Sequence, residues 1–318
     1  MPQALLDAIA SMALPTEAQR IFHGRGGAYP GCEQWSLDVY PPVCLLTSFA
    51  PADEATLQRI QAALAARWAE IAPSEALNLV YQQRDDTRAD TRVLAGEVPD
   101  PHVVREAGSQ FRVHLARGFN HGLFLDMAAG RSWVRTHIAE IAQGERPVRV
   151  LNLFAYTCAF SVVALQAGAE QVVNVDMAAG ALSIGKQNHQ LNGLTHGANF
   201  LPHDVFSTWG KIGRYGPYDL VIVDPPSYQK GSFVAEKDYA RLARRLPDLL
   251  KPGGQALLCL NSPKLGESFL RELMAQAAPA LNFAERLANP ATFPDVSSER
   301  ALKVLRYALP HTDEDSAG

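Results

Sequence analysis

The chain has 318 residues, of which 47% are hydrophobic and 19% charged, a composition typical of a soluble globular protein with one large domain or two modest ones. Its net charge of -4 excludes a global basic field, so any contact with nucleic acid is expected to come from a local patch. No apolar run approaches the length of a membrane span, and the N-terminus lacks the pattern of a secretory signal. We therefore expect a cytoplasmic protein with no membrane contact.

The four cysteines are Cys32, Cys44, Cys158 and Cys259, and no two of them form a Cys-x-x-Cys pair. This spacing is typical neither of a disulfide framework nor of a zinc cage. We expect free thiols in a reducing compartment and no bound metal.

Residues 1–122 are predicted to form a small α+β domain. A helix is expected over 53–71, because apolar residues recur every three or four positions from Leu57 to Trp68 and so form one buried face. Two adjacent prolines place the strand predicted over 37–49 at an edge or a bend. The other elements predicted in this part are a helix at 4–13, strands at 77–82, 111–115 and 122–125, and an exposed loop at 83–100.

Residues 123–318 alternate between strand and helix patterns. Repeated strand–helix units predict a parallel sheet that is covered on both faces. The predicted strands are 148–153, 171–175, 200–204, 220–223, 255–260 and 301–308, and the predicted helices are 132–143, 159–167, 178–191, 237–250 and 267–277.

The most informative stretch runs from residue 148 to residue 176. A buried strand, a tight loop over 154–157, an apolar helix and a second strand that ends on Asp176 form one right-handed βαβ unit. In open α/β sheets a ligand lies beyond the carboxyl ends of the strands. The loop and Asp176 are therefore predicted to meet one ligand, with Asp176 accepting hydrogen bonds from ribose hydroxyls. A βαβ unit that binds nothing is the alternative interpretation.

The loop over 154–157 discriminates between two nucleotide ligands. A dinucleotide site needs Gly-x-Gly-x-x-Gly so that the backbone can approach a pyrophosphate, and this loop contains no glycine. S-adenosylmethionine has no phosphate and needs no such cradle. The sequence thus disfavours a nicotinamide-dependent oxidoreductase and is compatible with S-adenosylmethionine.

A second informative stretch, from residue 219 to residue 231, has a strand that ends in Asp224-Pro225-Pro226, followed by Tyr228. The prolines fix the backbone and remove two amide donors, which leaves carbonyl acceptors at the turn. Asp224 can accept from an exocyclic amine, and the ring of Tyr228 offers a flat face on which a base can stack. This pattern favours a planar heteroaromatic acceptor over a plain proline turn with a packing tyrosine.

The combination resembles the class I S-adenosylmethionine-dependent methyltransferases, and within them the bacterial enzymes that methylate large-subunit ribosomal RNA. The resemblance implies a Rossmann-like α/β fold whose seven-stranded sheet has one reversed strand and is preceded by the small α+β domain. Members that modify carbon-5 of cytosine usually carry a further N-terminal RNA-binding domain, for which this chain is expected to be too short. The matching pieces are Gly122-Leu123-Phe124-Leu125-Asp126, Leu151-Asn152-Leu153-Phe154-Ala155-Tyr156-Thr157, Val175-Asp176, Asn188 with Leu191-Asn192-Gly193-Leu194, and Asp224-Pro225-Pro226.

The resemblance implies a methyl transfer from S-adenosylmethionine to a base, with the protein mainly positioning the two partners. The residues that it assigns to the target are Asp224, Pro225, Pro226, Tyr228 and Asn261. The residues that it assigns to the cofactor are Phe124, Asp126, Asn152, Phe154, Ala155, Tyr156, Thr157, Asp176, Met177, Asp204, Val205 and Asp224. The sequence departs from the family at Cys158, which places a larger side chain where backbone is expected to approach the ligand.

The acceptor atom depends on the segment around Cys259 and Asn261. Carbon-5 of cytosine is a poor nucleophile, so its methylation needs a cysteine thiolate that first adds to the ring. Alignment with the family places Asn261 at the nucleophile's position, and Cys259 has the pattern of a buried residue. A ring nitrogen of guanine is therefore favoured over cytosine. The alternatives are a methyltransferase that acts on a protein or small molecule, and a non-catalytic scaffold that binds cofactor or RNA; the sequence leaves the oligomeric state open.

Overall fold

The computed structural model describes residues 2–85, 89–226, 228–229 and 233–311. The chain splits into two compact units. Unit 1 is Met1–Ala128 together with Pro290–Ser297, and unit 2 is Ala129–Asn289 together with Ser298–Gly318. Nothing in the sequence indicates that 290–297 belongs to the first unit. Among the described residues, no helix has the length and apolar character needed to cross a membrane.

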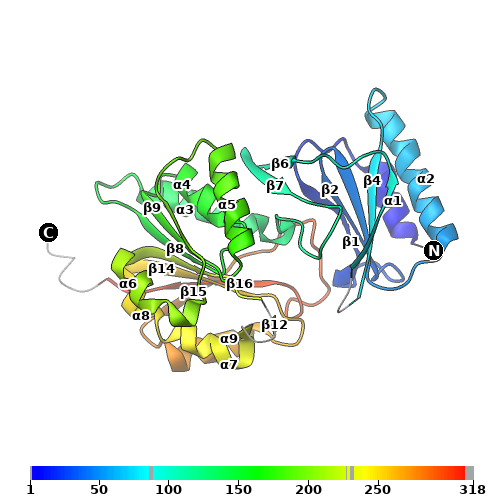
Figure 1. Ribbon diagram of the computed structural model, residues 1–318. Coiled ribbons are helices and arrows are strands. Elements are labelled where there is room, and N and C mark those ends of the chain that lie inside the picture. The colour runs from blue at the N-terminus through cyan, green and yellow to red at the C-terminus, as the bar shows by residue number, and fades with distance from the viewer. Residues whose placement is uncertain (1, 86–88, 227, 230–232, 312–318) are drawn as a thin grey trace. The chain divides into compact units, whose positions relative to one another are not determined.

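Unit 1 is built on a five-stranded sheet in the order β1-β2-β3-β4-β5, with helices α1 and α2 packed on it (Figure 1). Strand β3 runs parallel to β4, and the other neighbours in this sheet are antiparallel. Strands β6 and β7 pair separately. The elements are α1 (Gln3–Ser11), β1 (Gln19–His23), η1 (Gly24–Gly26), β2 (Trp35–Tyr40), β3 (Val43–Ser48), α2 (Glu54–Ile71), β4 (Asn78–Arg84), β5 (Ala89–Ala95), β6 (His102–Glu106), β7 (Ser109–Val113) and η2 (Leu125–Met127).

Helix α2 forms where its apolar spacing predicts. The Asp53 carboxylate caps its first turn by accepting from the Thr56 backbone N–H at 2.8 Å. Leu57, Ile60, Leu64 and Trp68 are all buried in the core of unit 1. The predicted helix and its buried face are thus confirmed.

Three predictions for unit 1 are wrong. The single strand expected over 37–49 is a hairpin of β2 and β3, because the proline pair lies at the turn between them. The exposed loop expected over 83–100 contains β5, an edge strand none of whose residues is buried and which therefore shows no apolar alternation. The strand expected over 122–125 does not form, and β7 pairs instead with β6. The sequence does not indicate β6 because its five residues are too few for a clear apolar pattern.

The segment 290–297 is fixed to unit 1 around a half-buried arginine, Arg20. Arg20 Nε and Nη2 donate to the two carboxylate oxygens of Asp38 at 2.7 and 2.8 Å, and Arg20 Nη1 donates to Nδ1 of His23 at 2.7 Å. The guanidinium carbon lies 4.3 Å from the ring centroid of Phe293. The backbone N–H of Val296 donates to the Gly26 carbonyl at 2.9 Å.

His23 makes the stability of unit 1 dependent on pH. Burial, and next the charge of Arg20, lower the pKa of His23 from 6.5 to about 4. The unfolded chain therefore binds a proton that the folded unit does not between these values, so the free energy of unfolding is expected to decrease as the pH falls from 6.5 to 4. His23→Gln removes this titration. When urea unfolding is measured at pH 7 and at pH 4.5, the free energy of unfolding should fall by less in the variant than in the wild-type protein. An equal fall in both proteins would refute the role of His23 in this pH dependence.

Unit 2 is built on a seven-stranded sheet in the order β10-β9-β8-β11-β14-β16-β15 (Figure 1). The neighbours from β10 to β14 are parallel, and β16 is antiparallel to both β14 and β15. The expected sheet with one reversed strand is confirmed. Its strands are β8 (Arg149–Leu153), β9 (Gln171–Val175), β10 (Ala198–Leu201), β11 (Tyr218–Val223), β14 (Leu250–Leu260), β15 (Asn282–Arg286) and β16 (Lys303–Ala308), and β12 (Tyr228–Gln229) and β13 (Phe233–Val234) form a separate hairpin.

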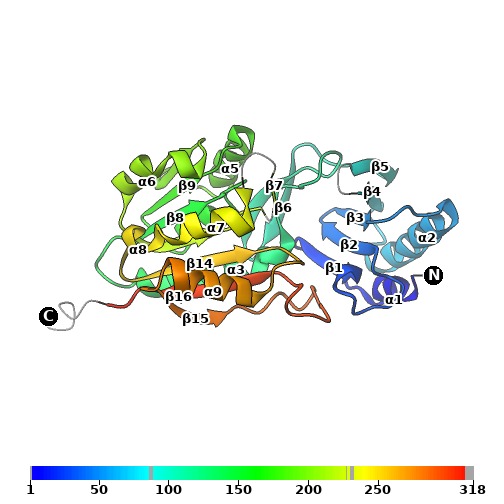
Figure 2. The ribbon, with the colours of Figure 1, turned by 90° about the horizontal axis from the view of Figure 1, so that it is seen from below.

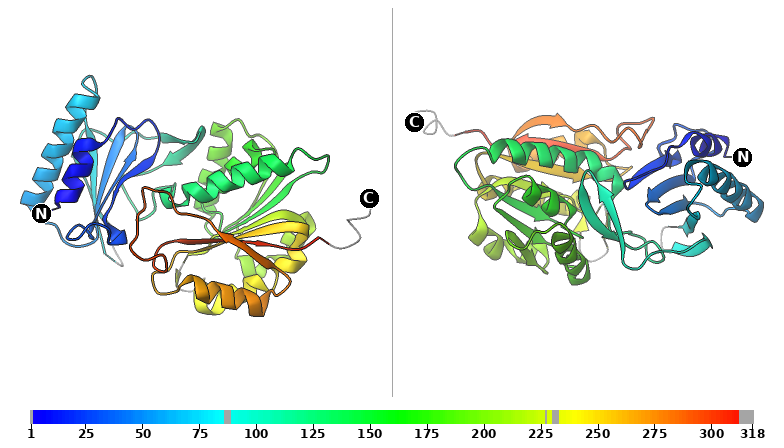
Figure 3. Two further views of the ribbon diagram at one scale, coloured as in Figure 1. Left: turned by 180° about the vertical axis from the view of Figure 1, so that it is seen from behind. Right: turned by 90° about the horizontal axis from the view of Figure 1, so that it is seen from above.

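Helices cover both faces of this sheet. Helices α3, α4 and α5 lie on one face, and Figure 3 shows this layer from above. Helices α7, α8 and α9 lie on the other face, which Figure 2 shows from below. The helices are α3 (Ala128–Ile141), α4 (Ala159–Gln166), α5 (Ala179–Leu191), α6 (Trp209–Tyr215), α7 (Ala235–Ala243), α8 (Leu246–Leu249) and α9 (Glu267–Ala277), with η3 at Val205–Ser207.

The sequence misplaced three elements of unit 2. The helix expected over 237–250 is two helices, α7 and α8, with a proline in the first turn of α8. Strand β15 was not expected, because most of its residues are exposed at the sheet edge and follow no apolar pattern. Helix α6 was not expected either, and Ile212 is its buried residue.

Candidate functional site

The loop after β8 is wound tightly at the carboxyl end of the sheet. Phe154, Tyr156 and Cys158 have φ values of 58°, 47° and 61°, in the left-handed region that residues other than glycine rarely adopt. The Ala155 backbone N–H donates to the Val175 carbonyl at 3.0 Å, which joins the loop to the end of β9. Such strain persists only where surrounding contacts hold it, and it gathers at ligand sites.

Asp176 is the residue that holds this loop from β9. One carboxylate oxygen accepts from the Tyr156 backbone N–H at 2.8 Å, and the other accepts from the Ala178 backbone N–H at 2.7 Å. Each carboxylate oxygen has capacity for a further hydrogen bond, and the side chain is half-buried. Met177, the next residue, is 49% exposed. Asp176 thus fixes the loop while keeping acceptor capacity toward a ligand with hydroxyl groups.

A buried polar network lies beneath the loop. The Asn152 amide donates to Asn174 Oδ1 at 2.9 Å, and the Asn174 amide donates to Ser161 Oγ at 2.9 Å. Ser161 in turn lies 2.9 Å from Nε2 of His189, and burial lowers the pKa of this histidine, which favours a neutral ring. Asn152, expected to contact the cofactor, is 1% exposed and supports the loop from below.

Thr157 and Cys158 are also buried rather than exposed toward a ligand. The Thr157 carbonyl accepts from the Asn188 amide at 2.9 Å, which gives a structural role to the asparagine that the resemblance singles out. A Cβ built on Gly185 would lie 2.5 Å from the sulfur of Cys158. The larger residue at position 158 is therefore accommodated by a glycine on α5.

The acceptor-side segment meets this loop through aromatic rings. Asp224, at the end of β11, is half-buried and precedes the β12–β13 hairpin. The ring centroid of Phe233 in that hairpin lies 5.4 Å from Phe154 and 6.1 Å from Tyr239. The loop after β8 and the segment after β11 therefore border one region of unit 2, as the sequence predicts. Tyr228 pairs through its backbone with Val234, and its side chain lies outside the described residues.

Cys259 and Asn261 differ sharply in accessibility. Cys259 is 0% exposed, and burial makes it a poor candidate for a nucleophile that must reach a base. Asn261, just past the end of β14, is exposed. All four cysteines are buried thiols, Cys259 among them as the sequence predicts.

The remaining candidates belong to other elements of the chain. The Asp204 carboxylate accepts from the Ser207 backbone N–H at 3.0 Å and so caps η3, while Val205 is 3% exposed and packs in the core of unit 2. Phe124 and Asp126 belong to unit 1. Phe124 is 42% exposed. Against the opposing effect of burial, the charge and hydrogen bond of Asp38, and after them the charge of Asp126, raise the pKa of Arg20.

Several supporting residues were missed from the sequence. Asn174 interrupts an apolar strand at an inward position, which is a usable signal for a buried polar network. Phe233, Tyr239 and Lys303 show no such signal, because each supports the site through a residue that is distant in sequence: Phe154, Cys259 and Ser262 respectively. In the described part of the chain, no group of three or more histidine, cysteine, aspartate or glutamate side chains is placed to hold a metal ion.

The known proteins that this chain resembles are described as methyltransferases. The sequence profile of the family described as S-adenosylmethionine-dependent methyltransferase matches residues 19–308. Ribosomal RNA large subunit methyltransferase I of Aeromonas salmonicida (strain A449) is 30% identical over 252 residues, 76% of this chain and 61% of the relative. Its counterpart in Aeromonas hydrophila is 33% identical over 229 residues, 69% of this chain and 55% of the relative. The chain thus spans less than two thirds of the length of both relatives.

Two solved structures share the fold. A methyltransferase crystallised with SAH has a TM-score of 0.77 at 23% identity, covering 96% of this chain and 81% of its own. A SAM-dependent methyltransferase from Agrobacterium tumefaciens has a TM-score of 0.66 at 19% identity, covering 94% of this chain and 91% of its own.

Proposed function

Because the chain belongs to the family of S-adenosylmethionine-dependent methyltransferases, we propose that it transfers a methyl group to a base in RNA, most specifically in large-subunit ribosomal RNA. The observation that carries the proposal is the contact between Phe154 and Phe233, which brings the cofactor-side loop next to the acceptor-side segment. The names of the Aeromonas relatives support ribosomal RNA as the substrate. The enzyme would act in the cytoplasm.

The residues after β8 and β9 fit S-adenosylmethionine. This cofactor supplies an electrophilic methyl group on a sulfonium. Asp176 would accept hydrogen bonds from the ribose, and the exposed Met177 would lie against the adenine. Phe154, Ala155 and Tyr156 would surround the methionine portion, with Asn152 and Thr157 holding their backbone in place. Asp204 and Val205 are proposed for the adenine side, and Phe124 and Asp126 are proposed as cofactor residues on the family resemblance alone.

The acceptor would be held by the segment after β11 and by the end of β14. Asp224 would accept from an exocyclic amine of the base, and Pro225 and Pro226 would fix the turn. Tyr228 would stack on the base, and Asn261 would provide an exposed amide beside it. Orientation of two reactants can supply several kcal/mol of a barrier, about 7–11 at most, so positioning by these residues can account for much of the rate.

We propose a ring nitrogen of guanine as the acceptor atom, because the exposed residue beside the target is Asn261 and Cys259 is fully buried. Cys259→Ala is accordingly expected to keep activity within about threefold, since no covalent intermediate is required for a nitrogen with its own lone pair. RNA that contains 5-fluorocytosine should form no covalent adduct with the wild-type protein. A trapped adduct that disappears in Cys259→Ala would reassign the target to carbon-5 of cytosine.

Unit 1 is proposed to contact the RNA through a cluster of arginines and aromatic rings. The guanidinium carbon of Arg84 lies 5.8 Å from the ring centroid of Phe49 and 5.2 Å from that of Phe119, and Arg25 lies 4.0 Å from Phe49. Burial, followed by the charges of Arg25 and Arg20, lowers the pKa of Arg84. A phosphate near these gathered cations would offset their mutual repulsion.

Arg84→Ala is expected to raise the KM for RNA several-fold, to lower the salt dependence of RNA binding by about one charge and to leave cofactor affinity unchanged. Arg92 is a matched control in the same unit, because its guanidinium carbon also lies near a ring, 5.1 Å from the centroid of Tyr81, but its Nη1 lies 3.7 Å from the Glu54 carboxylate, which offsets its charge. Arg92→Ala should therefore bind RNA like wild type. Equal KM values for the two variants would mean that unit 1 does not contact the RNA through Arg84.

The proposed function is tested by mass mapping of ribosomal RNA from cells with and without the gene. One methylated nucleotide of the large-subunit RNA should be absent from the deletion strain. Re-expression of the wild-type chain should restore it, and re-expression of Asp224→Ala should not. Unchanged ribosomal RNA in the deletion strain, together with methylation of a protein fraction by the purified enzyme, would overturn the RNA substrate.

A further inference from the structure

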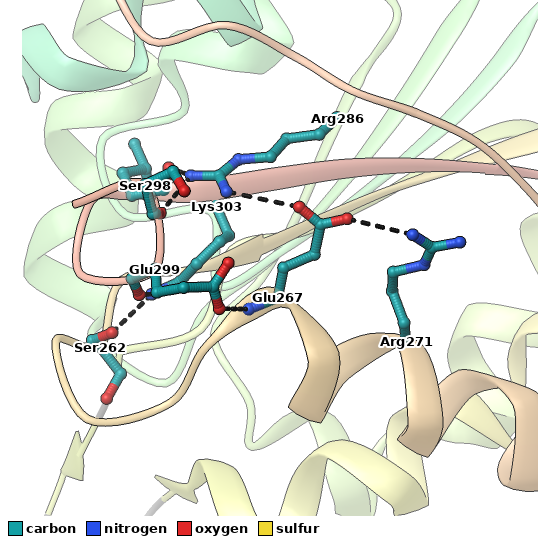
Figure 4. Close-up of polar contacts among 8 residues, drawn as sticks. Ser262, Glu267, Arg271, Arg286, Ser298, Glu299 and Lys303 are labelled. Carbon is teal, nitrogen blue, oxygen red and sulfur yellow. Dashed lines mark hydrogen bonds and ion pairs between the residues drawn. The ribbon is translucent and has the colours of Figure 1, made fainter.

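Lys303 is a fully buried lysine at the end of the sheet where the site lies. It has 0% exposure, and it pairs with Leu260 at the end of β14. Its ammonium donates to the Ser262 carbonyl at 2.6 Å and to the Glu299 carbonyl at 2.8 Å (Figure 4). Burying an ammonium is costly unless its donors are satisfied, so this arrangement holds both carbonyls firmly in place.

The second carbonyl belongs to a segment that is itself fixed. The Glu299 carboxylate accepts from the Glu267 backbone N–H at 2.9 Å, at the first turn of α9. Arg286 donates to the Ser298 carbonyl at 2.7 Å and to the Glu267 carboxylate at 3.3 Å (Figure 4). Lys303 therefore ties the chain after β14 to a rigid group of contacts rather than to a free loop.

The end of β14 is also held by a second buried group, Tyr239. The Tyr239 hydroxyl donates to the Cys259 carbonyl at 2.9 Å, and Tyr239 is 0% exposed. The carbonyl of Cys259, two residues before Asn261, and that of Ser262, directly after it, are thus bonded to Tyr239 and Lys303, while Asn261 itself is exposed. These two hydrogen bonds hold the backbone on both sides of Asn261, so the exposed side-chain amide of Asn261 starts from a fixed position.

We propose that Lys303 is a positioning residue that sets the backbone of Asn261 and Ser262 for the acceptor base. This inference rests on the proposed function, because it assigns the purpose of the anchor to methyl transfer. Misplacement of a reacting group by about 1 Å can reduce a rate by about 100-fold. An ammonium suits this place because it is compact and its three donors point in different directions, unlike a planar guanidinium.

The first test compares Lys303→Met and Lys303→Gln with the wild-type chain in a methylation assay on ribosomal RNA. Lys303→Met keeps the volume without donors, and Lys303→Gln keeps donors without charge. We expect kcat to fall by about 10- to 100-fold in the Met variant and less in the Gln variant, with the dissociation constant of S-adenosylmethionine unchanged within about twofold. Hydrogen exchange at the backbone amides of Asn261, Ser262, Lys264 and Leu265 should become faster in both.

Lys251 provides the matched control. Its ammonium donates to the Asp219 carboxylate at 2.7 Å and to the Pro147 carbonyl at 3.2 Å, near the start of β14 rather than its end. Lys251→Met removes a comparable set of bonds from the same sheet and should leave kcat unchanged. A similar loss of kcat in both variants would mean that Lys303 acts only through general stability.

A double-mutant cycle with Asn261→Ala gives the decisive readout. If Lys303 acts through Asn261, the double variant should be no slower than Asn261→Ala alone; independent effects would multiply. The proposal would be overturned if the losses in kcat multiply in the double variant, or if Lys303→Met leaves kcat unchanged. It would also be overturned if both Lys303 variants fail to fold. Absence of RNA methylation by the wild-type chain would instead refute the proposed function, so the two failures are distinguishable.

Discussion

Replacing Asp176 with alanine is expected to weaken binding of S-adenosylmethionine by roughly 2–3 kcal/mol, about 30- to 150-fold. The carboxylate has a double role. It would bond the ribose of the cofactor, and it accepts from the backbone N–H groups of Tyr156 and Ala178, which fixes the strained loop after β8. Alanine removes the acceptor and leaves both donors without it, so the loss should exceed that of one ordinary hydrogen bond. Calorimetric titration with S-adenosylmethionine measures the effect directly.

Asp219→Asn is a suitable control for this prediction. The Asp219 carboxylate also accepts from a backbone N–H, that of Arg149 at 2.7 Å, but near the amino ends of the strands. This variant should lose stability without losing cofactor affinity. Asp176→Asn, which keeps one acceptor oxygen, should lie between wild type and Asp176→Ala. A folded Asp176→Ala protein with an unchanged dissociation constant would remove this residue from the cofactor site.

Gly185→Ala is expected to destabilise unit 2 by about 1–3 kcal/mol through overpacking. The added Cβ would lie 2.5 Å from the sulfur and 3.1 Å from the Cβ of Cys158, and Cys158 is buried with little room to move. The strained loop should shift as well, so cofactor binding should weaken alongside stability. Urea unfolding and calorimetry on the same samples measure both.

A second substitution at position 158 separates this clash from other effects of alanine. Cys158→Gly in the Gly185→Ala background removes both close atoms and suits the φ of 61° at position 158. The double variant should recover most of the lost stability. Cys158→Ala in the same background removes only the sulfur and should recover less. If neither restores stability, the pairing of these two positions is not the cause.

The elements that the sequence predicts best are those that the fold buries most. The strand at 171–175 and the helix at 267–277 have the predicted bounds, because each presents a clear apolar pattern to one core. Edge strands β5 and β15 escape prediction because their exposed residues leave no pattern to read. The proline pair after β2 predicts an edge or a bend but not the turn of a hairpin, since the pairing partner of a strand is a long-range property.

The site follows the same division. Asp176 and the loop after β8 are neighbours within one βαβ unit, and local sequence identifies both. The burial of Asn152 and the anchoring of Asn261 by Tyr239 and Lys303 depend on residues that are far apart in the chain. The motif predicts that Asn152 contacts the ligand, because the sequence gives the position of this residue in the motif but not the direction of its side chain.

The segment 290–297 has a consequence for the order in which the chain can fold during synthesis. Unit 1 needs the contact of Phe293 with Arg20 and the hydrogen bond from Val296 to Gly26. Phe293 and Val296, however, follow nearly all of unit 2 in the chain. The N-terminal unit can therefore begin to fold early on the ribosome but cannot be completed until residue 297 has emerged. A nascent chain stopped at residue 128 should accordingly be more sensitive to protease around Arg20 than the released protein.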